Sequence, residues 1–185
     1  MLEVLHDVSL ALYNLFLIPT VFLSVILYSL LFANIFSNEK LKIKRNSYNP
    51  FVSIIVPTYN DPIAKRCVDS CLKSNYKNFE ILVADDSTDE KAKRIIDSIK
   101  NKKVKIIRRN NRNGFKAGAL NNALRFAKGE IIIIFDADWV VPKNFLEKII
   151  KYFSDEKVAI VQAKQDFMNF NQNFISKFTY ILMSI

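Results

Sequence analysis

Glycine, proline, cysteine and histidine are all scarce in this chain of 185 residues. It has 3 glycines, 5 prolines, 2 cysteines and 1 histidine, and no repeat or low-complexity run. Such a composition argues against collagen-like, repeat and disordered chains. Because 50% of the residues are hydrophobic, the chain is long enough for one α/β domain with its own core and a short appendage.

The shortage of histidine and cysteine excludes several kinds of site. With His6 as the only histidine, this sequence has neither a histidine-based catalytic triad nor a histidine-rich metal centre. Cys67 and Cys71 lie four residues apart in an expected helix. We interpret them as small buried residues, with a reactive or redox pair as the alternative.

Positive charge is in excess. The chain carries 27 lysines and arginines against 18 acidic residues, a net charge of +9, which calls for an acidic partner such as nucleic acid, anionic lipid or a phosphorylated small molecule. No nucleic-acid-binding module is recognisable, so we expect no nucleic acid partner. The densest basic stretch is interpreted as a solvated face, with a position near anionic lipid headgroups as the alternative. It consists of Lys100, Lys102, Lys103, Lys105, Arg108, Arg109 and Arg112.

A long uncharged run lies near the start of the chain. Residues 8–38 hold no charged side chain, and residues 10–36 are apolar and long enough to cross a bilayer as a helix. A cleaved signal peptide is the alternative, but the run is too long for one and its leading flank carries Glu3 and Asp7 instead of lysines. Residues 40–45 carry four basic side chains, so the positive-inside rule predicts that the rest of the chain lies in the cytoplasm.

From residue 51 onwards, short apolar runs alternate with amphipathic stretches. The runs are β-branched and mostly continuous, as in strands covered on both faces, and the stretches repeat apolar residues at helical spacing. Asp61 and Pro62 are expected to begin the first of these helices. The alternation predicts an α/β fold with a doubly wound, mostly parallel sheet and helices on both faces. The expected strands are residues 51–56, 79–84, 104–107, 130–135 and 158–162, and the expected helices cover residues 64–72, 92–99, 119–127 and 145–153.

Polar residues follow three of the expected strands at their carboxyl ends. They are residues 57–60, residues 85–89, and the pair Asp136 and Asp138. In a doubly wound sheet the loops at this edge form the ligand-binding crevice. Two carboxylates at i and i+2 can approach one cation, and Mg²⁺ or Mn²⁺ takes such oxygen ligands together with diphosphate oxygens. A solvated turn, or a helix N-cap before Pro142, is the alternative.

Four motifs, in this order, resemble those of one enzyme family. PTYN (57–60), DDSTD (85–89), NGFKAGALNNAL (113–124) and DADWVVP (136–142) look like the motif set of the family-2 glycosyltransferases, which have the GT-A fold. VQAKQDFMN (161–169) also resembles a segment of the membrane-bound, cellulose-synthase-like branch, with an ordinary edge strand and loop as the alternative. The resemblance implies an inverting hexosyltransferase that uses a nucleotide-diphosphate sugar.

The resemblance also implies roles for individual residues. Thr58 and Tyr59 are expected near the base and ribose, and Asp86 is expected to accept a hydrogen bond from the uracil imide of a UDP-sugar. Lys116 is expected near the diphosphate. The expected cofactor is Mg²⁺ or Mn²⁺, acting as a Lewis acid. The expected nucleotide-sugar-binding residues are Pro57, Thr58, Tyr59, Asn60, Asp85, Asp86, Lys116 and Asp136, and the expected metal ligands are Asp138 and Asp136.

The sequence departs from the family pattern on the acceptor side. The family carries its catalytic base in an E-D or T-E-D motif after the DxD, and processive members add Q-x-x-R-W; neither occurs here. Asp166 is the candidate substitute base. Three interpretations stay open: a fragment of a longer glycosyltransferase, a chain whose site is completed by a second polypeptide, or a catalytically inert nucleotide-sugar-binding or scaffold subunit. The acceptor, a saccharide or a lipid-linked group, is not identified by the sequence.

The expected organisation has four parts. Residues 1–45 form a transmembrane helix with its basic flank, residues 46–50 a linker, residues 51–170 the GT-A nucleotide-sugar-binding domain, and residues 171–185 a truncated apolar or interfacial helix. The expected location is the cell membrane, with the domain on the cytoplasmic side.

Overall fold

The protein is described by a computed structural model, which covers residues 2–36 and 48–163. The chain divides into two compact units, residues 1–41 and 42–185. The expected boundaries at residues 45, 50 and 170 stay predictions, and the expected helix at residues 171–185 lies outside the described residues.

The described part of the first unit is a single helix, α1 (Leu2–Phe36). Its segment Val4–Ala33 has a mean hydropathy of 2.4 and is long and apolar enough to cross a membrane. The hydroxyls of Thr20 and Ser24 donate to carbonyls four residues back, over 2.7 and 2.8 Å. These polar groups are therefore satisfied inside the helix, as a lipid environment requires.

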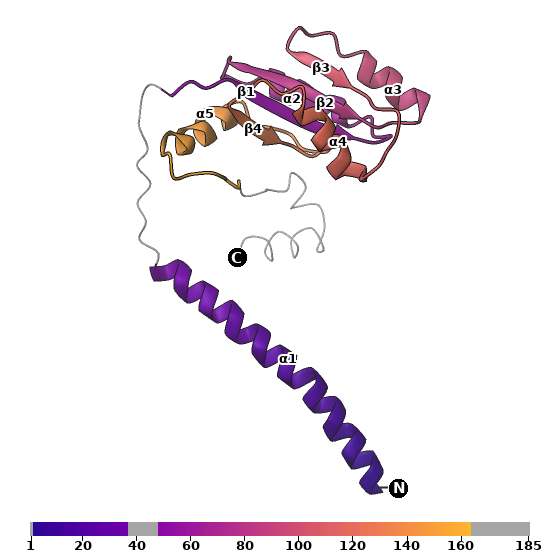
Figure 1. The fold of residues 1–185 in the computed structure, drawn as a ribbon, viewed down its shortest axis with the longest axis vertical. Helices are drawn as coiled ribbons and strands as arrows, with labels where there is room; N and C mark the ends of the chain where they lie inside the picture. The colour runs from indigo at the N-terminus through magenta and orange to yellow at the C-terminus, as the bar shows by residue number, and fades with distance from the viewer. Residues whose placement is uncertain (1, 37–47, 164–185) are drawn as a thin grey trace. The chain divides into compact units, whose positions relative to one another are not determined.

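The second unit is built on a four-stranded parallel sheet with the order β3-β2-β1-β4 (Figure 1). Val52 of β1 lies opposite Phe79 of β2 and Ile131 of β4. The central strand β1 is buried at every position, because neighbours flank it on both edges and helices cover both faces. The strands are β1 (Val52–Thr58), β2 (Phe79–Asp85), β3 (Val104–Ile107) and β4 (Ile131–Ile134).

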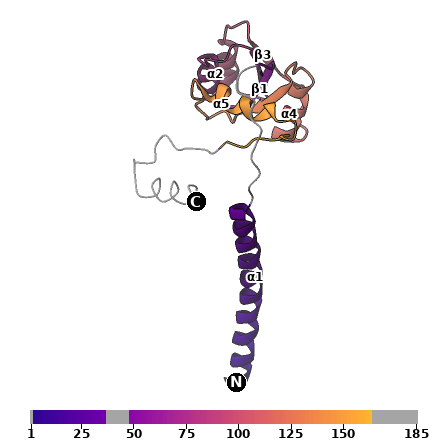
Figure 2. The same ribbon diagram turned by 90° about the vertical axis from the view of Figure 1, so that its left-hand side faces the viewer.

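Helices cover both faces of the sheet. Ile54 packs in one core cluster with residues of α2 and α5, whereas Ile55, which points to the opposite face, packs with Ala119 and Ala123 of α4. Figure 2 shows α2 and α5 on one side of β1 and α4 on the other. The predicted doubly wound α/β fold is thereby confirmed. The helices are α2 (Ala64–Leu72), α3 (Glu90–Asp97), α4 (Phe115–Leu124), α5 (Phe145–Ile150) and the 3₁₀ turn η1 (Lys151–Ser154).

Two expectations about local structure are wrong. Residues 158–162 form no strand, and Ile160 is 87% exposed; a β-branched run becomes a strand only where a neighbouring edge offers ladder partners. Asp61 does not cap α2 either. Its carboxylate accepts from the N–H of Ile63 over 2.9 Å in a turn before the helix, which begins at Ala64 without a side-chain cap.

Candidate functional site

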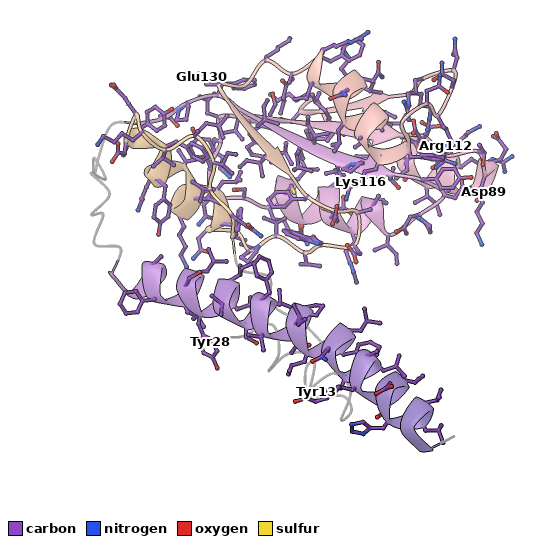
Figure 3. The ribbon with its side chains drawn as sticks, turned by 60° about the horizontal axis from the view of Figure 1, so that its bottom comes forward. Tyr13, Tyr28, Asp89, Arg112, Lys116 and Glu130 are labelled. Atoms are coloured by element: carbon purple, nitrogen blue, oxygen red, sulfur yellow. The ribbon has the colours of Figure 1, made fainter. Side chains whose placement is uncertain are left out.

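A cavity of about 440 Å³ lies at the carboxyl ends of the strands. Figure 3 shows Arg112 and Lys116 towards the end of the sheet where Asp89 lies, whereas Glu130, which precedes β4, lies at the opposite end. Side chains from the loops after β1, β2 and β4, and from the start of α4, contribute to its walls. The lining residues are Pro57, Thr58, Tyr59, Asp61, Asp86, Arg112, Phe115, Lys116, Ala119, Asp136, Ala137 and Asp138.

Asp136 and Asp138 project from a tight turn beyond β4. The N–H of Trp139 donates to the carbonyl of Asp136 over 3.1 Å, which closes the turn. Phe135, just before the turn, is 2% exposed, and its ring centroid lies 5.8 Å from that of Trp139. Aromatic residues on both sides of the turn therefore anchor the two carboxylates to the core.

Helix α2 holds the same loop from the side. Nη2 of Arg66 donates to the carbonyl of Asp138 over 3.0 Å, and the N–H of Val141 donates to the Ser70 hydroxyl over 2.9 Å. The backbone on both sides of Trp139 is thus tied to a helix that is itself buried against the sheet.

The two carboxylates differ in their surroundings. Asp136 forms an ion pair with Lys116, and both side chains are about half exposed, at 44% and 59%. Asp138 is exposed, and within residues 2–36 and 48–163 its carboxylate has no hydrogen-bond or ion-pair partner. No group of three or more His, Cys, Asp or Glu side chains in the described part of the chain could hold a metal ion by itself. A cation here would need further oxygens from a ligand.

Asp86 is held by Arg109. Nε and Nη2 of Arg109 donate to Oδ1 and Oδ2 of Asp86 over 2.8 and 2.6 Å, and the side chains are 13% and 6% exposed. The hydrogen bonds to Asp86 raise the pKa of Arg109 above its ordinary value, against the opposing effect of desolvation. The guanidinium of Arg109 therefore stays charged at any physiological pH.

Asp85, the neighbour of Asp86, does not line the cavity. It is 1% exposed, it accepts from Nε of Arg108 over 2.8 Å, and its other oxygen accepts from the N–H of Ser87 over 3.0 Å. Arg108 also pairs with Asp97 of α3. The buried position of Asp85 gives it a structural part in holding the loop after β2.

Asn60 does not line the cavity either. It adopts a left-handed conformation with φ 52°, and its amide oxygen accepts from the N–H groups of Thr88 and Asp89 over 2.7 and 2.9 Å. Its own N–H donates to the Ser87 hydroxyl over 2.9 Å. Asn60 thus ties the loop after β1 to the loop after β2, and the expectation of a direct ligand contact has no support from its position.

Arg112 is a cavity residue that the sequence interpretation missed, since it was assigned to a solvated basic face. Its guanidinium carbon lies 3.3 Å from the ring centroid of Tyr59 and 5.7 Å from that of Phe115. Its Nε is buried and has no hydrogen-bond acceptor among the described residues. Its place between β3 and α4, at the same edge of the sheet as the motifs, is the signal that could have identified it.

Most of the residues expected at the site do come together. Asp86 after β2 and Asp138 after β4 share the one cavity, which the sequence interpretation required. Asn60 and Asp85 do not line it, and Asp166 lies outside the described residues. The expected residues that line the cavity are Pro57, Thr58, Tyr59, Asp86, Lys116, Asp136 and Asp138.

Comparison with known proteins finds relatives for most of the chain. Residues 53–183 match the family described as Glycosyl transferase family 2. The beta-monoglucosyldiacylglycerol synthase of Trichormus variabilis is 36% identical over 143 residues, which are 74% of this chain and 30% of that protein. The Escherichia coli UDP-Glc:alpha-D-GlcNAc-diphosphoundecaprenol beta-1,3-glucosyltransferase WfaP is 40% identical over 111 residues, 58% of this chain and 43% of its own length. The chain thus spans less than half of these relatives.

Solved structures resemble the chain as well. The mannosyltransferase PcManGT from Pyrobaculum calidifontis, in complex with GDP-Man and Mn²⁺, has a TM-score of 0.62 and 32% identity. The match covers 77% of this chain and 45% of that one. S. aureus TarS 1-349 in complex with UDP-GlcNAc has a TM-score of 0.52 and 26% identity, over 62% of this chain and 37% of its own.

Proposed function

The chain belongs to glycosyl transferase family 2, and we propose that its cavity binds the nucleotide-sugar donor, a UDP-sugar, of a membrane-anchored glycosyltransferase. The observation that supports this proposal is that the loops after β2 and β4 and the first turn of α4 bring Asp86, Asp138 and Lys116 to one cavity of about 440 Å³. Such a volume is that of a small-molecule site, and its mixture of carboxylates and cations suits a diphosphate held together with a metal ion.

Asp136 and Asp138 fit a divalent metal such as Mg²⁺ or Mn²⁺. These ions are held by one or two carboxylates together with substrate phosphate oxygens, and the described residues supply this partial set and no complete cage. When bound, the ion would supply a Lewis acid for the charge on the departing nucleoside diphosphate. Lys116, which pairs with Asp136, adds a positive charge on the same wall.

Titration of the purified chain with UDP, with and without Mn²⁺, tests this proposal. We expect UDP to bind more tightly with the metal, and Asp138→Asn to remove most of that gain because it replaces a charged ligand by a neutral one. Asp69→Asn, in an ion pair with Lys65 on α2 and outside the cavity, is the matched control. UDP affinity that does not depend on Mn²⁺, or on Asp138, would count against the site.

The acceptor is proposed to be lipid-linked and reached at a membrane surface. Two similar proteins carry names that specify a diacylglycerol product and a diphosphoundecaprenol acceptor, and α1 offers an apolar segment of 30 residues. We place the sugar-binding unit on the cytoplasmic side, where nucleotide sugars are available and where the basic residues 40–45 predict it to be.

Sugar transfer itself needs a base for the acceptor hydroxyl. The candidate Asp166 lies outside the described residues, so the donor-binding part of the reaction is the part that the cavity supports. An assay of UDP-glucose hydrolysis and of transfer to a lipid acceptor separates the alternatives: turnover by the purified chain rejects an inert binding subunit, and tight UDP binding without turnover supports it.

A further inference from the structure

Arg109 already occupies the end of the Asp86 carboxylate. Nε and Nη2 of Arg109 reach its two oxygens side by side, so the guanidinium meets the carboxylate as a two-pronged fork. A carboxylate has about four acceptor positions, and the fork takes the two that point forward in parallel. The remaining positions, one on each oxygen, point apart.

Arg109 is not free to turn away from Asp86. Its Nη1 donates to the carbonyl of Asn113 over 2.6 Å, and its Nη2 donates to the carbonyl of Phe115 over 2.8 Å. Releasing Asp86 would break these bonds as well, and it would leave a carboxylate that is 6% exposed without its partner. The fork is therefore held in place against Asp86, whose side chain lines the cavity.

Nucleobases differ in what they can offer to such a carboxylate. Guanine presents two parallel donors, N1–H and the exocyclic N2–H, which need the same forward pair of acceptor positions that Arg109 fills. Uracil presents one donor, N3–H, which a single remaining position can accept. A buried donor that finds no acceptor costs binding energy, and for guanine the unpaired amine would also face a guanidinium.

We propose that Arg109 is the residue that selects the base of the donor: it converts Asp86 into a one-donor acceptor, which admits uracil and rejects guanine. This inference rests on the proposed function, since it takes Asp86 as the residue that meets the base. It assigns UDP-sugars to a chain whose solved relatives include complexes with both GDP-Man and UDP-GlcNAc.

Three nucleotides test the inference on the unaltered full chain in detergent micelles with Mn²⁺. They are UDP, GDP and inosine diphosphate, which has the size of GDP but lacks the exocyclic amine. We expect UDP to bind at least about tenfold more tightly than GDP, the effect of one unpaired buried donor. We also expect inosine diphosphate to bind several-fold more tightly than GDP, because its only imide donor can use a single acceptor position. If Asp86 instead accepted from two donors of the base, GDP would bind more tightly than inosine diphosphate.

A pair of variants tests the role of Arg109 in selecting the base. Arg109→Lys keeps the positive charge beside Asp86 but removes the fork, so the ratio of UDP to GDP affinity is expected to fall several-fold, with GDP binding improved. Arg108→Lys is the matched control, because Arg108 pairs with Asp85, which does not line the cavity, and it should leave the ratio unchanged. Circular dichroism and thermal unfolding establish that each variant is folded.

The outcomes separate the two proposals. If the unaltered chain binds GDP more tightly than UDP or inosine diphosphate, or if a folded Arg109→Lys protein keeps the original ratio, the inference is overturned and nucleotide-sugar binding stands. If the chain binds none of the three nucleotides, the proposed function is overturned and the inference with it. If Arg109→Lys does not fold, the order of GDP and inosine diphosphate on the unaltered chain decides.

Discussion

At Gly118 the first turn of α4 comes so close to the preceding loop that no side chain fits. A Cβ at this position would overlap the backbone carbonyl oxygen of Asn113 and Nη1 of Arg109. The same carbonyl accepts a hydrogen bond from Arg109. Glycine here therefore allows the contact that holds the Asp86 partner in place.

We predict that Gly118→Ala lowers the free energy of unfolding by about 1–3 kcal/mol, the usual cost of overpacking. Helix propensity alone would favour alanine by roughly 0.5–1 kcal/mol, but the overlap is with backbone, which cannot move aside as a flexible side chain can. Urea unfolding followed by circular dichroism measures the change. Asn121→Ala, on the exposed face of the same helix, should stay within about 0.5 kcal/mol of the unaltered chain; equal stability of the two variants would contradict this account.

Arg112 lies over Tyr59 inside the cavity, and its buried Nε lacks an acceptor among the described residues. A buried guanidinium N–H without an acceptor can donate to a phosphate oxygen of a bound ligand. We predict that Arg112→Leu weakens the binding of UDP about tenfold or more. The binding of UMP should weaken less, and that of uridine, which has no phosphate, should change little. Competition titrations measure the three affinities, with Arg125→Leu, outside the cavity, as control. An equal loss for all three ligands would indicate a packing role against Tyr59.

At the scale of elements, α2 connects the core to the site. Its inner side buries Cys67 and Cys71 against the sheet, while Arg66 and Ser70 hold the loop that carries Asp138. The interpretation of the two cysteines as small buried residues is confirmed by their burial. Because α2 is buried against the sheet and also hydrogen-bonds the loop, it holds the loop in a fixed position relative to the core.

The thiol of Cys71 should resist modification while α2 stays packed. A hydrogen bond with Cys67, and then burial, raise the pKa of Cys71 above the ordinary value of 9.0, so the reactive thiolate is scarce in the folded state. We predict that iodoacetamide at pH 8 labels the native chain slowly and the urea-unfolded chain rapidly, as mass spectrometry would show. Rapid labelling of the native chain would contradict the packing of α2.

The raised pKa of Cys71 also makes the stability of the fold depend on pH. Because the pKa of the thiol is higher in the folded than in the unfolded chain, its contribution to the free energy of unfolding is fully present below pH 9.0 and decreases as the pH rises further.

Strand prediction succeeded inside the sheet and failed at its margin. The runs at β1 and β2 were identified because both of their faces are buried and their residues are mostly apolar. Residues 158–162 have the same composition, but strand formation there depends on a partner edge, which is a property of the tertiary structure. Residue pattern alone does not carry that information.

At the scale of the whole molecule, an apolar helix and a basic unit of glycosyl transferase family 2 share one chain. The segment Val4–Ala33 is long enough to span a bilayer, and its leading flank is acidic whereas its trailing flank is basic. This combination supports the proposal that a water-soluble donor and a lipid-linked acceptor meet at a membrane surface.

We predict that the full chain sediments with membranes, resists extraction by alkaline carbonate and is released by detergent. A reporter fused after residue 185 should be active in the cytoplasm. Leu17→Arg, near the middle of the segment, should reduce insertion because a central arginine costs about 2.5–3.5 kcal/mol, whereas Leu17→Ile should have no effect. Recovery of the unaltered chain in the soluble fraction would refute membrane anchoring.

The sequence by itself determined the alternation of strands and helices, the position of the polar loops at one edge and hence the approach of Asp86 to Asp138. These follow from local periodicity and from the rule that parallel strands present their carboxyl ends together. Only the tertiary structure decided which of those polar residues face the cavity. Asn60 and Asp85 instead hydrogen-bond to neighbouring loops. Of the residues expected on a solvated face, Arg112 lines the cavity and Arg109 pairs with Asp86. The reason is physical: the partner of a charged side chain is chosen by distance and burial among residues far apart in the chain, and Asp86 and Arg109 meet across 23 positions of sequence.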